Sequence, residues 1–172
     1  MRRFLILKLQ GPMQAWGDHT YEDYRPSMAF PGRSALLGLL GACLGIRREE
    51  PARQQALASS LRFAVRVDGR FSRLTDFHTV LAARKVGGKV NDNSVVSPRE
   101  YLVPMDLGAS FTVAVWEADA AEVSLGQVAA AVRRPVFTPF LGRRSCPLAR
   151  PLYEAELETA DAIAALAEVP PV

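Results

Sequence analysis

The chain has 172 residues, of which 49% are apolar and 23% charged, and this composition excludes a disordered chain and suits one globular domain, residues 1–172. Its formal net charge is +3, but residues 151–172 hold five acids and no base, so residues 1–150 carry an excess of eight positive charges. A basic body with an acidic C-terminal segment is typical of a protein with a polyanionic partner, although a solvated charged surface has the same composition.

Membrane, secretory and metal-binding classes are disfavoured by the sequence. The longest apolar stretch, residues 34–46, is too short to cross a bilayer. Arg2 and Arg3 precede an alternating pattern rather than a secretory leader. Two histidines and two widely separated cysteines indicate no zinc site. We expect a cytoplasmic protein with no membrane partner, metal or cofactor.

The first half of the chain begins with an alternating run over 3–9, which predicts a strand. A polar loop follows over 11–33, and then a helix over 34–46 that Ser34 could cap and Gly45 could end. A short helix is predicted over 51–60. Within the first helix, Gly38, Gly41 and Gly45 share one face, which we expect to pack on the protein's own sheet rather than on a ligand or subunit.

The second half alternates strands and helices around one polar insertion. Strands are predicted over 61–68, near 71–80, and over 100–103, 110–117 and 152–158, and helices over 124–134 and 160–167. Residues 82–99 are too polar for a core and predict a protruding hairpin or mobile loop. The order β-α-β-β-α-β predicts an α+β, ferredoxin-like fold with its helices on one face of an antiparallel sheet, and the other face of such sheets often binds RNA.

Evidence for catalysis is weak. His78 follows Asp76 by two residues on a predicted strand, so a carboxylate–histidine pair is possible, but a structural histidine is the preferred interpretation. The glycine-containing loops lack the Gly-Lys-Ser/Thr ending of a nucleotide phosphate loop.

Candidate binding residues are more numerous. Gly32-Arg33-Ser34 opens a helix, where backbone N–H groups favour a phosphate. Residues 142–145, Gly-Arg-Arg-Ser, offer two guanidinium groups and a hydroxyl, and the polar insertion carries four bases. The loop QGPMQAWG, residues 10–17, places a glutamine and a tryptophan where a base could bind, or where Trp16 could close the sheet edge.

Five blocks of sequence, in order, resemble the CasD family, the Cas-five-type subunit of the type I-E CRISPR surveillance complex, Cascade. The blocks are LILKLQGPMQAWG (5–17), FPGRSALLGLLGACLGI (30–46), DFHTVLAAR (76–84), REYL (99–102) and TPFLGRRSCPLARPL (138–152).

The resemblance implies a RAMP-type ferredoxin-like domain whose thumb hairpin corresponds to about 82–99. It implies a non-catalytic subunit that caps the 5′ handle of the CRISPR RNA, contacts the backbone subunit and the large subunit, and meets target DNA only indirectly. Residues 140–145 lie where the family has a glycine-rich loop, although they hold a single glycine.

We therefore expect RNA binding by these residues: Gln14, Trp16, Arg33, Ser34, Arg84, Lys85, Lys89, Arg99, Arg143, Arg144 and Ser145. One alternative is a metal-independent endoribonuclease that cleaves precursor CRISPR RNA with His78 and Lys85. Another is a protein-only scaffold in which the glycine face and the tail bind partners.

Overall fold

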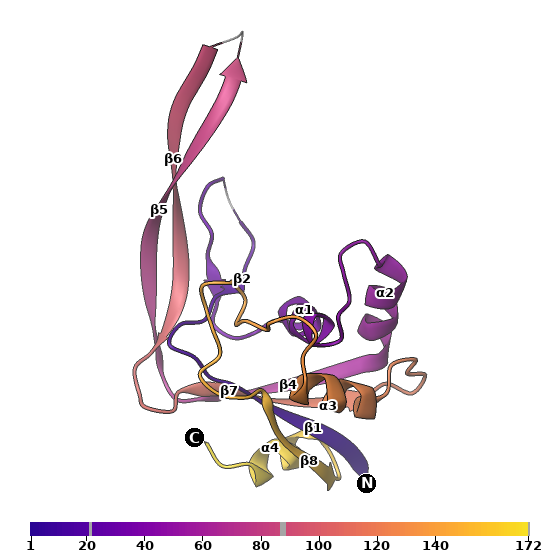
Figure 1. The fold of residues 1–172 in the computed structure, drawn as a ribbon. Coiled ribbons are helices and arrows are strands. Elements are labelled where there is room, and N and C mark those ends of the chain that lie inside the picture. Colours follow the sequence, from indigo (N-terminus) through magenta and orange to yellow (C-terminus); the bar gives the residue numbers. More distant parts are fainter. Residues whose placement is uncertain (21, 87–88, 172) are drawn as a thin grey trace.

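The computed structural model describes the backbone of residues 1–20, 22–86 and 89–171, and the side chains of 1–20, 22–79 and 96–171. A central sheet carries helices on both faces, and a long hairpin projects away from it (Figure 1). The elements in chain order are β1 (Arg2–Leu9), β2 (Trp16–Gly17), β3 (Ser27–Met28), α1 (Arg33–Cys43), α2 (Pro51–Ser60), β4 (Leu61–Asp68), β5 (Phe71–Val86), β6 (Lys89–Pro104), β7 (Ser110–Glu117), α3 (Leu125–Arg133), β8 (Tyr153–Thr159) and α4 (Ala162–Glu168).

The central sheet has four strands in the order β4-β7-β1-β8, and every neighbouring pair is antiparallel. Strand β1 pairs with β7 on one side and β8 on the other, so Leu5 lies opposite both Val115 and Glu156. The predicted mixed α and β class with an antiparallel sheet is confirmed. The predicted ranges of the core strands agree with β1, β4, β7 and β8 to within one or two residues.

The main core lies between the sheet and helices α1 and α3. Leu5, Leu7 and Leu9 point from β1 to this face and are buried there. Helices α1 and α3 cover them with the apolar side chains Leu36, Leu40, Cys43, Leu125, Val128 and Val132. Alternation along β1 therefore supplies one complete face of the core.

The second face of the sheet is also covered, which corrects the expectation that the helices occupy a single face. Phe4 and Ile6 point to this side and pack with Ala165 and Leu166 of α4. Strand β1 is apolar on both faces, so both must be shielded from water. Helix α4 lies on the opposite side of the sheet from α1 and α3 (Figure 1). The sheet therefore does not offer a fully open face to RNA.

A buried ion pair lies under the C-terminal segment on this second face. Lys8 Nζ is 3.0 Å from Asp68 Oδ2 and donates a hydrogen bond to the carbonyl oxygen of Pro170, also at 3.0 Å. The side chain of Lys8 is fully buried and that of Asp68 is 2% exposed. Arg66 donates to Asp68 Oδ1 and to the carbonyl oxygen of Leu166 in α4. These cations hold the C-terminal segment against the sheet.

The polar insertion belongs to a hairpin that is longer than expected. Strands β5 and β6 pair from Phe71↔Pro104 to Val86↔Lys89 and form a separate two-stranded sheet. The strand expected near 71–80 and the segment 82–99 are thus parts of one hairpin, which begins 11 residues earlier than the polar pattern indicates. At its base Phe71, Tyr101 and Leu102 pack in or against the main core, whereas Leu74 and Phe77 are exposed, so polarity alone does not mark the base.

Helix α1 ends where glycine predicts. Gly45 has a φ of 68°, and the N–H groups of Gly45 and Ile46 bond to the carbonyl oxygens of Ala42 and Gly41. This pattern is a Schellman motif, in which glycine adopts the left-handed conformation at low cost. The N-cap is Gly32 rather than Ser34, which lies in the first turn.

In the described part of the chain, no helix is both long and apolar enough to span a membrane.

Candidate functional site

Four segments distant in sequence meet at the base of the hairpin. Gln14 and Leu102 exchange two backbone hydrogen bonds of 2.9 and 2.7 Å. Arg25 is held in the same way by Pro98 and Glu100, at 2.9 and 3.0 Å. The loop 140–146 joins them through a 3.1 Å bond from the N–H of Ala15 to the carbonyl oxygen of Leu141. The base of the hairpin is therefore fixed to the body by backbone contacts on both sides.

Three arginines converge at this point, and we call Arg25, Arg99 and Arg143 the arginine cluster. The backbone of Arg25 forms a bridge with Arg99 and accepts a 3.0 Å hydrogen bond from Arg143 Nη2. The Arg143 guanidinium lies 4.9 Å from the centroid of the Tyr101 ring. Arg143 Nη1 and Arg99 Nε are buried and have no hydrogen-bond partner among the residues that the structure describes. Both side chains are otherwise partly exposed, and a guanidinium group at the surface can bind phosphate oxygens.

A carboxylate network stiffens the same region. Glu100 accepts a hydrogen bond from the Tyr24 hydroxyl and another, of 3.0 Å, from the N–H of Ser27. Arg73 Nη1 lies 2.6 Å from Glu100 Oε2 and 2.7 Å from the carbonyl oxygen of Ser27. Partial burial raises the pKa of Glu100, but the bonds from Tyr24, Ser27 and Arg73 outweigh it and hold this pKa below its usual value. The same bond to Glu100 raises the pKa of Tyr24.

Replacing Glu100 with glutamine is expected to lower the free energy of unfolding by about 1–3 kcal/mol at pH 7, because charge-assisted hydrogen bonds are lost. Since the folded pKa is depressed, the contribution of Glu100 is complete above its ordinary pKa and is lost as the pH falls through the folded value. Urea unfolding between pH 7 and pH 3 measures it. The difference between wild type and Glu100→Gln should shrink toward acid pH, and a constant difference would contradict the assignment.

The loop 10–17 does not present its glutamine and tryptophan to a ligand. Trp16 is fully buried, lies edge to face with Phe111 at a centroid distance of 6.4 Å, and donates its backbone N–H to Ser27 Oγ at 2.9 Å. Gln14 is fully buried and donates to the carbonyl oxygen of Leu9 at 3.0 Å. This corrects the expectation of a base-stacking platform and favours the alternative in which Trp16 closes the core, because so large an apolar side chain gains most by burial.

At the start of α1, Arg33 does not have the free guanidinium that was expected for a phosphate contact. Arg33 donates to the carbonyl oxygens of Ala58 and Leu61, the latter at 3.2 Å, so it serves the C-terminal end of α2. Its guanidinium also lies 5.8 Å from the ring centroid of Phe63. Helix C-terminal carbonyls attract a cation, which explains why the exposed Arg33 side chain binds the end of α2 instead of leaving its guanidinium free for a phosphate. Ser34 remains exposed.

The loop 140–146 separates one inward and two exposed polar residues. Gly142 has a φ of 86°, and this turn directs Arg143 toward Arg25 while Arg144 and Ser145 stay exposed. Bonds of 2.8 and 2.9 Å, from the N–H of Leu141 to Cys146 and from the N–H of Cys146 to Arg143, close the loop. Arg143 thus joins the arginine cluster, and Arg144 lies beside it in sequence on the surface.

The hairpin residues do not form a compact site. The side chains of Arg84, Lys85 and Lys89 lie outside the described residues. His78 is exposed in β5, and seven residues of extended strand place its Cα roughly 23 Å from that of Lys85. This separation speaks against joint action of His78 and Lys85 on one phosphate.

Within the described residues, no group of three or more His, Cys, Asp and Glu side chains could hold a metal ion.

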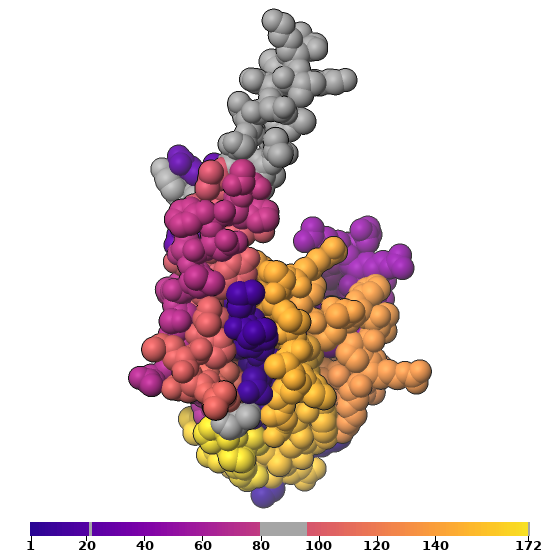
Figure 2. Space-filling model, turned by 60° about the vertical axis from the view of Figure 1, so that its left-hand side comes forward, coloured from indigo at the N-terminus to yellow at the C-terminus, as the bar shows by residue number. Residues whose placement is uncertain are grey.

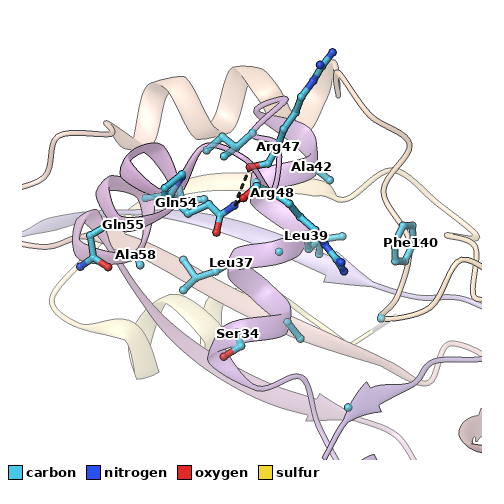
Figure 3. Close-up of a pocket in the computed structure, with 18 residues that line it drawn as sticks. Ser34, Leu37, Leu39, Ala42, Arg47, Arg48, Gln54, Gln55, Ala58 and Phe140 are labelled. Atoms are coloured by element: carbon cyan, nitrogen blue, oxygen red, sulfur yellow. Dashed lines mark hydrogen bonds between the residues drawn. The ribbon is translucent and has the colours of Figure 1, made fainter. Parts of the chain in front are cut away.

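A groove lies between α1, α2 and Phe140 of the loop 140–146 (Figure 3). Its volume is about 960 Å³, and Gly38, Leu37 and Leu57 are among the lining residues. The expectation that the glycine face of α1 packs on the protein's own sheet is wrong for Gly38, which is exposed.

Several residues of the site lie outside the residues proposed from sequence. Arg25, Arg73, Tyr24 and Glu100 come from the long polar loop and the hairpin, and no local spacing connects them. The block REYL, which carries the family resemblance, does contain Arg99 and Glu100, so it was a usable signal for the hairpin base.

Comparisons with known proteins agree with this architecture. The sequence model of the family "CRISPR-associated protein (Cas_Cas5)" matches residues 4–172. The "CRISPR system Cascade subunit CasD" of Escherichia coli (strain K12) is 46% identical over 181 residues, which cover 100% of this chain and 79% of that protein.

Two solved structures share the fold. A chain of a "CRISPR RNA-guided surveillance complex" superposes with a TM-score of 0.71 at 31% identity, covering 95% of this chain and 66% of that one. The "Crystal structure of Cas protein" superposes with a TM-score of 0.63 at 28% identity, covering 95% and 69%. The family resemblance seen in the sequence is confirmed. The chain is similar to the CasD subunit, and it belongs to the CRISPR-associated Cas5 family.

Proposed function

We propose that this chain is a non-catalytic, RNA-binding subunit of a type I-E Cascade complex, and that it grips the 5′ handle of the CRISPR RNA at the base of the β5–β6 hairpin. The observation that carries the proposal is the arginine cluster, where Arg25, Arg99 and Arg143 meet around one backbone position. Arg144 and Ser145 would extend this surface toward solvent. The relative's name as a Cascade subunit supports the assembly.

The architecture supports the rest of the assignment. The element order β1-α1-β4-β7-α3-β8 and the strand order β4-β7-β1-β8 match a ferredoxin-like arrangement, which supports a RAMP-type domain with β5–β6 as its thumb. The β5–β6 hairpin projects from the body (Figure 1), which gives it the reach to contact a backbone subunit, and target DNA would be met only through the assembled complex. The described base of this hairpin, in magenta and salmon, lies beside the N-terminal segment in indigo (Figure 2). Single-stranded handle bases are readable because they are unpaired, unlike those of an A-form duplex.

Replacing Arg143 with alanine is expected to weaken binding of single-stranded CRISPR repeat RNA from the same genome by about tenfold or more, because a charge-assisted contact to phosphate is lost. The slope of log affinity against log salt concentration should also fall by about one. Filter binding or fluorescence anisotropy on the full chain measures both quantities. Arg134→Ala, an exposed arginine after α3, is the matched control and should leave affinity and slope unchanged.

Equal affinities of wild type and Arg143→Ala, with both folded, would overturn the assignment of the cluster to RNA. Specific cleavage of the repeat RNA by the purified chain in EDTA, lost in His78→Ala, would instead make the chain an endoribonuclease.

A further inference from the structure

The groove beside α1 is open because a glycine forms part of its wall. A Cβ added at Gly38 would meet nothing within 4 Å, and one at Gly41 would reach only Leu57 and Ile46, at 3.8 and 4.0 Å. Glycine costs about 1 kcal/mol in a helix interior, so its position here is informative. Figure 3 shows Leu37 on the α2 side of α1, and Leu39 on its other side, toward Phe140. The glycine leaves room for another molecule.

The chemistry of the lining changes along the groove. The apolar side chains of its lining include Leu37, Ile46, Leu57 and Phe140. Arg47 and Arg48 lie at one end, and no acid is among the described lining residues. Gln54 Nε2 donates to the carbonyl oxygens of Arg47 and Arg48 at 2.8 and 3.2 Å, so the turn that carries both arginines is anchored to α2. The groove is therefore apolar with one positive end.

A protein segment fits this arrangement better than a strand of RNA does. RNA carries a phosphate at every nucleotide, and along most of the groove those phosphates would lie against aliphatic side chains. Phe140 is the single aromatic side chain in the described lining, whereas successive bases need successive stacking partners. The arginine cluster is reached from a different side of the loop, since Arg143 turns to Arg25 while Phe140 and Gly142 line the groove.

We propose that this groove receives an apolar segment of a neighbouring protein subunit, with an acidic residue of that segment paired to Arg47 or Arg48. Apolar side chains would enter the space over Gly38, where burial is favourable and the glycine allows close approach. The carboxylate supplies the charge that the groove lacks. This inference rests on the proposed function only in that the chain works inside a multi-protein complex.

The test fills the groove and follows the composition of the complex. Gly38→Leu places an aliphatic side chain in open space, so it should preserve the fold, and its unfolding temperature should not fall. The chain is tagged, co-expressed with the CRISPR subunits encoded in the same genome, purified, and the ratio of each subunit is measured. We expect the recovery of one protein subunit to drop by about tenfold or more. Gly126→Leu, at an exposed helical glycine of α3, is the matched control and should leave all ratios unchanged.

A cross-linking residue then identifies the occupant. With p-benzoylphenylalanine at Gln55, an exposed lining position, the purified complex should yield a cross-linked peptide from the same subunit that Gly38→Leu releases. That peptide should hold apolar residues and at least one acid.

Unchanged subunit ratios in Gly38→Leu would overturn the inference, as would a cross-link to RNA or loss of RNA affinity in the isolated variant. These outcomes leave the proposed function intact when wild type still assembles and Arg143→Ala still loses RNA. A wild-type chain that recruits no CRISPR subunit would overturn both proposals.

Discussion

Replacing Asp68 with asparagine is expected to lower the free energy of unfolding by about 3–5 kcal/mol, because it leaves the buried Lys8 ammonium without its counter-charge. Lys8 Nζ is 3.0 Å from Asp68 Oδ2, and its remaining described contact is to the carbonyl oxygen of Pro170. Thr112 and Arg66 also donate to the same carboxylate. Urea denaturation at pH 7 measures the loss.

The matched control is Asp106→Asn, which breaks an exposed ion pair with Arg70 of 3.1 Å. Exposed pairs contribute little, so this change should cost much less stability than Asp68→Asn does. Similar losses in the two variants would contradict the role given to burial.

In the wild-type protein, acid pH should remove the stabilisation that the ionised Asp68 carboxylate provides. Burial raises the pKa of Asp68, but the hydrogen bonds from Arg66, Thr112 and Lys8 outweigh it and keep this pKa below its usual value. The stabilisation is thus complete above the ordinary pKa of an aspartate and disappears as the pH falls through the lower folded value. The C-terminal segment, which Lys8 and Arg66 hold by its carbonyl groups, should then be the first part to gain hydrogen exchange.

Replacing Gly142 with alanine is expected to lower the free energy of unfolding by about 2–4 kcal/mol and to weaken RNA binding as well. An added Cβ would lie 1.8 Å from the backbone oxygen of Ala15, and the φ of 86° disfavours any side chain. Relief requires the loop 140–146 to move away from the loop 10–17, which displaces Arg143 from Arg25. Thermal unfolding and RNA affinity, measured on one preparation, test both effects.

Gly17→Ala is the matched control, because a Cβ there would meet nothing within 4 Å and its backbone needs no glycine. It should change stability by less than about 0.5 kcal/mol and leave RNA affinity unaltered. A tolerated Gly142→Ala with full RNA binding would show that the loop position does not set the site.

The sequence by itself determined the elements of the body and the family. Alternation along β1, β4 and β7 is a local property of each strand, and the end of α1 follows from the freedom of Gly45 alone. The family blocks are likewise contiguous stretches, and one of them, REYL, contains Arg99 and Glu100 of the hairpin base.

Only the tertiary structure decided which polar and aromatic residues are available. Trp16 and Arg33 carry the same side chains whether they meet a ligand or their own chain, and contacts with Phe111 and with the end of α2 settle that choice. Lysine is usually exposed, and the burial of Lys8 requires Asp68, a partner 60 residues away in the sequence. Such pairings depend on how the strands align in space, so no local pattern of residues can specify them.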